Sequence, residues 1–332
     1  MKTTLHLYDL KPAAASRWIP GDQYPRALAR ALMRPWRGRP PGGLAKVTQN
    51  LCLGLDRIGQ PWQLHARPEL PRGDEPLGIL DGPVDVVRRM ARDHRAMTGV
   101  GVIGFPDQWP AMFEETRISC HLQACEWAAA YYRPYYGSRV RIWPVGIDTD
   151  ACAPGSARAR EFDFLVYNKL RWPQELPEPG LRDRVLAELQ RRGLTYFEIG
   201  YGRYPKGREN SYHALLGRSR AMLFLCENET QGIAYNEALS MGVPMLAWNP
   251  RRWLDPNRHA HQLGDCPASS VPYWDERCGE QFHQLAELPD ALDRFLEHLR
   301  AGRYAPRDYI MENLTLAACA RRYVELLEEN IP

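Results

Sequence analysis

The chain has 332 residues, which is long for one core and sufficient for two domains, because single hydrophobic cores stop growing at about 250–300 residues. Charged residues make up 25% of it and hydrophobic residues 44%, a usage typical of globular proteins that argues against intrinsic disorder. The formal net charge of +3 lacks the basic excess of a nucleic-acid-binding domain, so we expect no nucleic-acid partner.

The cysteines and the amino-terminal residues indicate the compartment. The eight cysteines include no CxxC pair and no Cys/His spacing of a zinc site, which favours small buried side chains in a reducing environment. The stretch "MKTTLHLYDL" alternates apolar and polar residues, unlike a signal peptide. No apolar run approaches the roughly 20 residues that a membrane span needs. We therefore expect a cytoplasmic protein.

The first half of the chain alternates strand and helix signals. A stripe of apolar residues at steps of three and four predicts a helix over 42–59, closed by Gly59. Strands are expected over residues 3–9, 61–66, 77–82, 99–105, 116–122 and 139–145. This order predicts a parallel α/β domain over residues 1–145.

The same alternation restarts and predicts a second α/β domain over residues 146–305. Its strands are expected over 162–168, 195–202, 221–226 and 243–248, and its helices over 180–193, 211–219, 233–241 and 288–302. Residues 306–332 are amphipathic with no strand after them, and we expect them to form a helix that packs back toward the N-terminal domain.

The segment after strand 221–226 carries two carboxylates, Glu229 and Glu237, on either side of Gly232. In an open parallel sheet, ligands bind outside the carboxyl ends of the strands. If a helix begins near Gly232, the backbone N–H groups of Gly232 and Ile233 offer a phosphate seat at its positive end. A carboxylate accepts hydrogen bonds from paired hydroxyls, so two of them beside a phosphate seat suit a sugar nucleotide.

Three stretches together resemble a known family. They are Glu229, Gly232 and Glu237-Ala238 followed by "SMGVPMLA", then "WPVGIDTDACAP" (143–154), and "GGLAKVTQNL" (42–51). They resemble the signatures of GT-B glycosyltransferases, in particular the retaining family 4. The resemblance implies an α/β protein of GT-B fold, with two Rossmann-like domains facing across a cleft and C-terminal helices.

The resemblance also implies roles for the residues around the predicted phosphate seat. Glu237 would hold the ribose hydroxyls and Glu229 the donor sugar, while Gly232 and Ile233 would donate backbone hydrogen bonds to the diphosphate. The sequence "TQG" stands where the family usually has Gly-aromatic-Gly, so Thr230 and Gln231 are expected to make side-chain contacts instead.

Other positions carry over from the same resemblance. Lys169 falls on the position of the family's phosphate-neutralising Arg, and Arg171 is the substitute for a later Lys that this chain lacks. Gly202 would lie at the base, Gly43 at the diphosphate and Tyr273 in the donor pocket. The implied reaction transfers a sugar from a nucleoside diphosphate to a glycan, lipid-linked or small-molecule acceptor hydroxyl. The resemblance also implies that the reaction proceeds with retention and without a bound metal or cofactor.

Candidates for the acceptor side are fewer. An inverting enzyme would need a general base, for which Asp22 and Asp107 are available, but both stand in proline-bounded loops where Asp commonly forms turns. His121 is an acceptor-side candidate because histidine titrates near neutrality, although a lone histidine at a strand end is more often structural.

Two other functions fit the same fold: a sugar-nucleotide epimerase, and a catalytically idle subunit that binds a partner. Residues 25–35 form a short basic amphipathic pattern ending at Pro35. It can lie on the anionic inner face of a membrane or dock on its own domain, and the sequence leaves both open.

Overall fold

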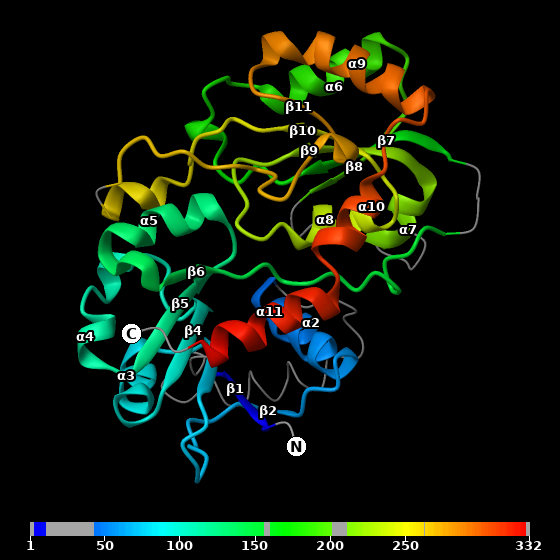
Figure 1. Ribbon diagram of the computed structural model, residues 1–332. Helices are drawn as coiled ribbons and strands as arrows, with labels where there is room; N and C mark the ends of the chain where they lie inside the picture. The colour runs from blue at the N-terminus through cyan, green and yellow to red at the C-terminus, as the bar shows by residue number, and fades with distance from the viewer. Residues whose placement is uncertain (1–2, 11–42, 156–159, 201–210, 262, 330–332) are drawn as a thin grey trace, which may run out of the picture.

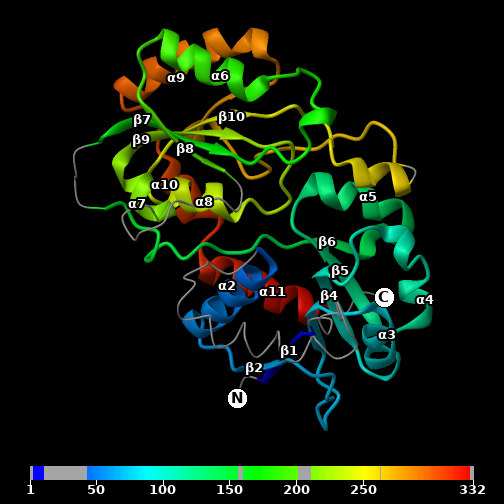
Figure 2. The ribbon, with the colours of Figure 1, turned by 180° about the vertical axis from the view of Figure 1, so that it is seen from behind.

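The computed structural model describes residues 3–10, 43–155, 160–200, 211–261 and 263–329 (Figure 1). They form two bodies, each built on its own parallel β-sheet, and the same division is seen from behind in Figure 2. The sequence prediction of two parallel α/β domains is confirmed. Asp22, the pattern over 25–35 and Gly202 lie outside the described residues.

The N-terminal sheet, within the described residues, has the strand order β2-β1-β3-β4-β5-β6, and every adjacent pair is parallel. Its strands are β1 (Leu5–Asp9), β2 (Trp62–His65), β3 (Leu77–Asp81), β4 (Ala96–Gly101), β5 (Ile118–Gln123) and β6 (Val140–Ile142). The helices of this half are α2 (Gly43–Arg57), α3 (Val84–Asp93), α4 (Met112–Glu115) and α5 (Glu126–Tyr136).

The C-terminal sheet has the order β11-β10-β9-β7-β8 and is also parallel throughout. Its strands are β7 (Phe162–Asn168), β8 (Tyr196–Gly200), β9 (Ser219–Leu225), β10 (Met245–Trp248) and β11 (Gly279–Phe282). The helices that follow β7 are α6 (Leu181–Arg191), α7 (Tyr212–Arg218), α8 (Ile233–Ser240), α9 (Leu288–Arg300), α10 (Pro306–Asn313) and α11 (Leu316–Glu328).

Strand β9 is buried on both faces, as its apolar run predicts. Because successive side chains of a strand point to opposite faces, Met222 and Phe224 pack in one core cluster while Leu223 and Leu225 pack in the other. The carboxyl end of this central strand therefore stands in the middle of the sheet edge, with the ends of β7 and β10 on either side. The segment that contains Glu229 begins at that point.

The structure corrects several sequence predictions. The strand expected over 99–105 is β4 and lies earlier, at Ala96–Gly101, and the short polar strand β11 was not expected. Helices α3 and α5 were also not expected. The terminal run forms two helices where one was predicted, because Thr315 begins a new helix by accepting a hydrogen bond from the Ala318 N–H at 3.2 Å.

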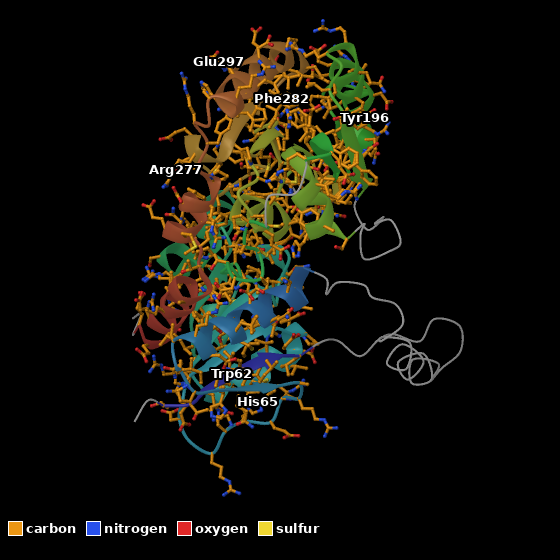
Figure 3. All side chains as sticks on the ribbon, turned by 90° about the vertical axis from the view of Figure 1, so that its right-hand side faces the viewer. Trp62, His65, Tyr196, Arg277, Phe282 and Glu297 are labelled. Atoms are coloured by element: carbon orange, nitrogen blue, oxygen red, sulfur yellow. The ribbon has the colours of Figure 1, made fainter. Side chains whose placement is uncertain are left out.

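The C-terminal helix α11 returns to the N-terminal body and packs beside α2 (Figure 1). The approach is close at Gly54, where an added Cβ would stand 2.5 Å from the Leu316 carbonyl oxygen. The segment between β6 and β7, which joins the two sheets, is bound to the segment that leads into α11. The Ile147 N–H donates a hydrogen bond to the Leu314 carbonyl at 2.8 Å. The side-chain view separates the two bodies, with Trp62 and His65 in one and Tyr196, Phe282 and Glu297 in the other (Figure 3).

No helix within the described ranges is both long enough and apolar enough to cross a bilayer. All eight cysteines are free, and only Cys266 is not buried.

Candidate functional site

Gly232 stands immediately before α8 and adopts a left-handed backbone conformation. Its φ of 62° and ψ of 39° lie in the left-handed region, which glycine adopts without the steric cost of a Cβ. The Gly232 carbonyl accepts from the Asn236 N–H at 3.1 Å, which closes the first turn. The N–H groups at the start of α8 stand free of helical partners, as at every helix start.

Glu229 lies in the segment between β9 and α8 and forms an ion pair with Lys169. Lys169 directly follows the neighbouring strand β7, and its N–H donates to the Leu225 carbonyl at 2.7 Å, which fixes it beside the end of β9. The two side chains are 13% and 15% exposed. Burial by itself would lower the pKa of Lys169, but the charge of Glu229 and their hydrogen bond outweigh it and raise that pKa, so the ammonium stays charged.

Glu227 organises the segment that carries Lys169, a role that sequence analysis did not assign. The carboxylate is fully buried, and its Oε1 accepts hydrogen bonds from the N–H groups of Arg171 at 2.6 Å and Trp172 at 2.9 Å. The loop after β7 is therefore fastened to the loop after β9. The Arg171 guanidinium stacks over the Trp172 indole, 4.1 Å from the ring centroid.

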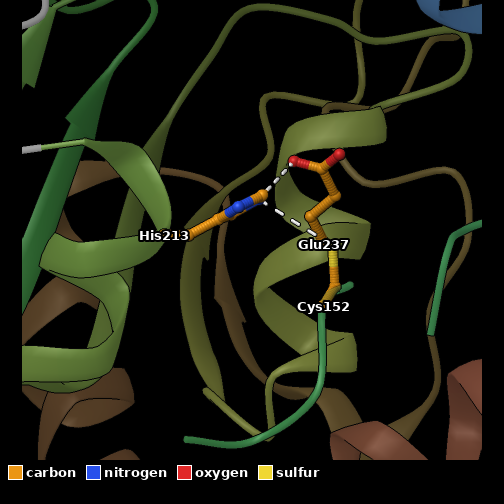
Figure 4. Close-up of side chains that lie close together, drawn as sticks. All are labelled: Cys152, His213 and Glu237. Atoms are coloured by element: carbon orange, nitrogen blue, oxygen red, sulfur yellow. Dashed lines mark hydrogen bonds and ion pairs between the residues drawn. The ribbon is translucent and has the colours of Figure 1, made fainter. Parts of the chain in front are cut away.

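Glu237 lies on α8 and is contacted through both of its carboxylate oxygens. Its Oε1 is 3.3 Å from the Lys46 ammonium of α2, and its Oε2 is 3.0 Å from the His213 Nε2 of α7 (Figure 4). The Glu237 side chain is 11% exposed. Lys46 and His213 were not among the predicted site residues. Lys46 stands three residues after Gly43, and His213 lies in a predicted helix. No local sequence pattern shows which face of its helix either residue occupies.

Cys152, His213 and Glu237 are the cluster of described residues whose atom types could ligate a metal. Their ligand atoms all lie within 4.8 Å of one another, and the Cys152 Sγ is 3.8 Å from the His213 Nε2 (Figure 4). Burial, together with the charge of Glu237, raises the pKa of the Cys152 thiol to about 12 in the metal-free protein. The Lys46 ammonium is already paired with the Glu237 carboxylate, which weakens the attraction of this cluster for a cation.

The remaining predicted donor residues have varied surroundings. Thr230 is exposed, and an added Cβ at Gly43, the first residue of α2, would meet no atom of the described residues within 4 Å. The Gln231 side chain has a structural partner instead of a free face: its amide pairs with the Val145 N–H at 3.0 Å and the Val145 carbonyl at 3.2 Å. Gln231 thus holds the connection between the domains, because its amide matches both backbone groups of one residue.

Ile233 and Tyr273 pack on the core around α8. Ile233 touches one core cluster of each domain. Tyr273 packs against the C-terminal cluster, and its N–H donates to the Tyr235 hydroxyl oxygen at 3.0 Å. Burial raises the pKa of Tyr273, whose hydroxyl is enclosed. Tyr273 therefore belongs to the core that packs against α8 in this conformation.

His121 on β5 is enclosed in the N-terminal core. Its ring is fully buried, with Nδ1 2.9 Å from the Thr98 hydroxyl and Nε2 2.9 Å from the Gln123 amide. Burial lowers the pKa of His121 to about 3, so the ring is neutral. A ring enclosed in this way does not reach an acceptor in this conformation, and its surroundings match the structural alternative.

Asp107 lies at the contact between the two domains. Both of its carboxylate oxygens are 2.8 Å from the Nδ1 of His261, which belongs to the C-terminal half. The same contact includes the ring of Phe105, stacked on His261 with a centroid separation of 3.5 Å. Asp107 thus has a partner in the opposite domain.

A cavity of about 320 Å³ lies elsewhere, and we do not assign the donor to it. It stands at the amino ends of β7 and β9, whereas Lys169 and Glu229 follow the carboxyl ends of those strands. Its lining residues are Arg160, Asp163, Leu194, Arg220, Leu296, Leu299 and Arg300. The candidate site is defined by the convergence of charged groups on α8, not by this cavity.

Comparison with known proteins identifies the fold. No family model and no curated protein matches the chain. Among solved structures, it is similar to AviGT4, a glycosyltransferase involved in avilamycin A biosynthesis, with a TM-score of 0.53 and 16% identity over 97% of both chains. It is also similar to WaaG, a glycosyltransferase involved in lipopolysaccharide biosynthesis, with a TM-score of 0.50 and 12% identity over 88% of this chain and 98% of that one. The chain has the two-domain GT-B fold of these neighbours.

Proposed function

We propose that this protein is a glycosyltransferase that moves a sugar from a nucleoside diphosphate to an acceptor hydroxyl, with retention of configuration and without a bound metal. The observation that carries the proposal is the arrangement around the start of α8. Two nearly buried carboxylates, Glu229 and Glu237, flank this helix start, and each is paired with an ammonium group. Burying an ion pair costs desolvation free energy. Buried ionisable groups with specific charged partners are found most often at functional sites.

In the proposed donor complex, Glu237 accepts hydrogen bonds from the ribose hydroxyls and Glu229 from hydroxyls of the transferred sugar. The N–H groups of Gly232 and Ile233 donate to the diphosphate, and the positive end of α8 favours its negative charge. Lys169, which lies beside Glu229, balances the negative charge of the diphosphate. Retention, the family 4 relationship and the acceptor class, a glycan, a lipid-linked or a small-molecule hydroxyl, belong to this proposal.

The reaction breaks the bond between the anomeric carbon and a diphosphate oxygen and forms one between that carbon and the acceptor hydroxyl oxygen. The hydroxyl proton passes to the departing diphosphate on the same face of the sugar. Negative charge grows on the leaving group, and preorganised cations and N–H donors that meet such charge supply a large share of catalysis. The AviGT4 and WaaG structures share the fold and are both named as glycosyltransferases, which supports the reaction class.

The test is thermal stabilisation of the full chain by UDP, GDP, ADP, CDP and TDP and their common sugars. A ligand at 100 times its Kd adds about 2.7 kcal/mol to the free energy of unfolding. Glu237→Gln is the matched control, because it keeps the side-chain shape and removes the charge that the ribose would use. We expect one base to stabilise the wild type and its effect to fall in the variant.

Turnover is then measured with sugars on the stabilising base, as release of the nucleoside diphosphate with and without acceptors, and the product anomer is read by NMR. Acceptor-independent conversion of the sugar would favour the epimerase. Absence of any nucleotide effect, in wild type and variant alike, would favour the idle subunit and overturn the proposed function.

A further inference from the structure

The Lys46–Glu237 ion pair connects the two domains at the proposed ribose site. Lys46 lies in the first turn of α2 in the N-terminal half, and Glu237 lies on α8 in the C-terminal half. Their charged atoms are 3.3 Å apart, and the Lys46 side chain is 27% exposed. The ammonium therefore reaches the carboxylate from the opposite domain.

Both oxygens of Glu237 are occupied in this structure, Oε1 by Lys46 and Oε2 by His213. Ribose hydroxyls that bind Glu237 must displace at least one of these partners. Lysine carries its charge on a flexible four-carbon stem, whereas the imidazole of His213 has only two side-chain torsions and is fixed to α7. Lys46 is the partner that can leave with the smaller rearrangement.

The charge balance at this site shows where the released ammonium would go. A nucleoside diphosphate carries its phosphates on the sugar that Glu237 would hold, so they enter next to the Lys46 ammonium. Among the described residues near the end of β7, Lys169 is paired with Glu229, and the Arg171 guanidinium stacks on Trp172. Lys169 is the one lysine among the described residues of the C-terminal half, and the second described lysine, Lys46, comes from the opposite domain.

We propose that Lys46 is a second phosphate counter-ion, supplied by the opposite domain, and that donor binding transfers it from Glu237 to the diphosphate. The inference rests on the proposed function and adds a residue to it. While the site is free, Lys46 neutralises the buried carboxylate and holds the domains together at this point. With the donor bound, the same ammonium meets the charge that grows on the leaving group, so phosphate binding and domain contact are coupled through one side chain.

The experiment compares ligands that differ only in phosphate content. Uridine, UMP and UDP, with guanosine, GMP and GDP in parallel, are titrated calorimetrically into wild type, Lys46→Met, Lys46→Arg and Arg57→Met. Arg57 lies on the same helix and pairs with Asp148 and Asp150, so its variant controls for loss of one positive charge from α2. Circular dichroism and the Tm confirm that each variant is folded.

We expect Lys46→Met to weaken diphosphate binding by about tenfold to a hundredfold, since a hydrogen bond to a charged group is lost. Binding of the nucleoside should stay equal or become tighter, because the competitor for Glu237 is gone. Lys46→Arg should recover most of the diphosphate affinity, and Arg57→Met should behave as the wild type. In turnover, Lys46→Met should lower kcat as well as raise KM, because the ammonium meets charge that develops in the transition state.

Two results overturn the inference, and they are distinguishable. If the wild type binds a diphosphate and Lys46→Met binds it equally well, or loses nucleoside and diphosphate affinity alike, the counter-ion transfer is wrong while the proposed function stands. If the wild type binds none of these six probes, nor the adenine, cytosine and thymine diphosphates of the stabilisation panel, the proposed function fails and takes the inference with it.

Discussion

The carboxyl edge of the C-terminal sheet and the matching part of the N-terminal sheet handle ionisable groups in opposite ways. At the C-terminal edge, Glu229 and Glu237 are nearly buried, each beside an ammonium. In the N-terminal sheet, His121 is enclosed, neutral and satisfied by uncharged partners. The difference lies in the partners: each carboxylate has an ammonium beside it, one of them from the N-terminal domain, whereas His121 has only uncharged partners.

Aromatic side chains of α5 form one of the contacts between the N-terminal domain and the C-terminal half. The indole N–H of Trp127 donates to the Glu229 carbonyl at 2.8 Å, and the Tyr131 hydroxyl donates to the Pro267 carbonyl at 2.7 Å. Both rings also pack on Trp253 of the C-terminal half. The backbone of the residue that carries the Glu229 carboxylate is thus held from the opposite domain.

The largest effect is expected when one charge of the Lys169–Glu229 ion pair is removed. Lys169→Met leaves the Glu229 carboxylate nearly buried without its ammonium, which should cost about 3 kcal/mol of unfolding free energy. It should also lower kcat by about a hundredfold to a thousandfold, as the loss of one preorganised hydrogen-bond donor does in other enzymes. Urea unfolding and donor turnover measure the two effects.

The double variant Lys169→Met with Glu229→Leu sharpens this experiment. Replacing a buried ion pair by apolar side chains of similar size is often neutral, so most of the stability should return while activity does not. Arg252→Met, which breaks an exposed pair with Asp265, should change stability by less than about 1 kcal/mol and serves as a control. Recovery of turnover in the double variant would show that these charges only hold the fold together.

A smaller effect is expected from His121 and appears only as a dependence on pH. The unfolded chain binds a proton at this histidine below pH 6.5, whereas the folded protein does not until about pH 3. Its contribution to stability is therefore complete above pH 6.5 and is lost as the pH falls through that interval. The slope should approach about 1.4 kcal/mol per pH unit.

The measurement is the free energy of urea unfolding at several pH values for wild type and His121→Gln, which keeps polar atoms facing Thr98 and Gln123. Slopes are compared instead of absolute stabilities, so any packing loss cancels. Equal slopes in the two proteins would mean that the ring takes up a proton in the folded state and is not sealed in the core.

The smallest effect is expected at the domain contact of Asp107. Its pair with His261 is partly exposed, 38% and 20% by side chain, so Asp107→Asn should cost less than about 1 kcal/mol, and salt should reduce this further. Turnover should stay within about twofold of the wild type, whereas removal of a general base lowers rates by about a hundredfold or more. A loss of that size would place acceptor chemistry in the N-terminal domain.

The sequence predicted those parts of the fold and site that local patterns encode. The expected strand 162–168 coincides with β7, and Gly232 stands at the start of α8, because apolar runs and a lone glycine are local signals. Strand β11 was missed since "GEQF" is short and half polar, and it exists because β10 pairs with it. Helix α5 was missed because its apolar side chains lack a clear period and Pro134 interrupts it.

The partners of Glu237 could not be predicted because they depend on how distant segments meet. Lys46 comes from the opposite domain and His213 from another helix, and neither spacing nor composition encodes their approach. The same holds for the pairing of Gln231 with Val145. Contacts between domains depend on tertiary packing, and local sequence patterns do not encode it.

The packing of α11 on α2 also sets an order of events during translation. Tyr323, Leu326 and Leu327 complete the apolar cluster around Leu7 and Leu55 of the N-terminal half. Domains generally fold as units while the chain leaves the ribosome, beginning with the amino-terminal one. Here the last strand of the C-terminal sheet is synthesised some 40 residues before that cluster can close. The half that is made first thus finishes last, and its apolar face stays open until α11 has been made.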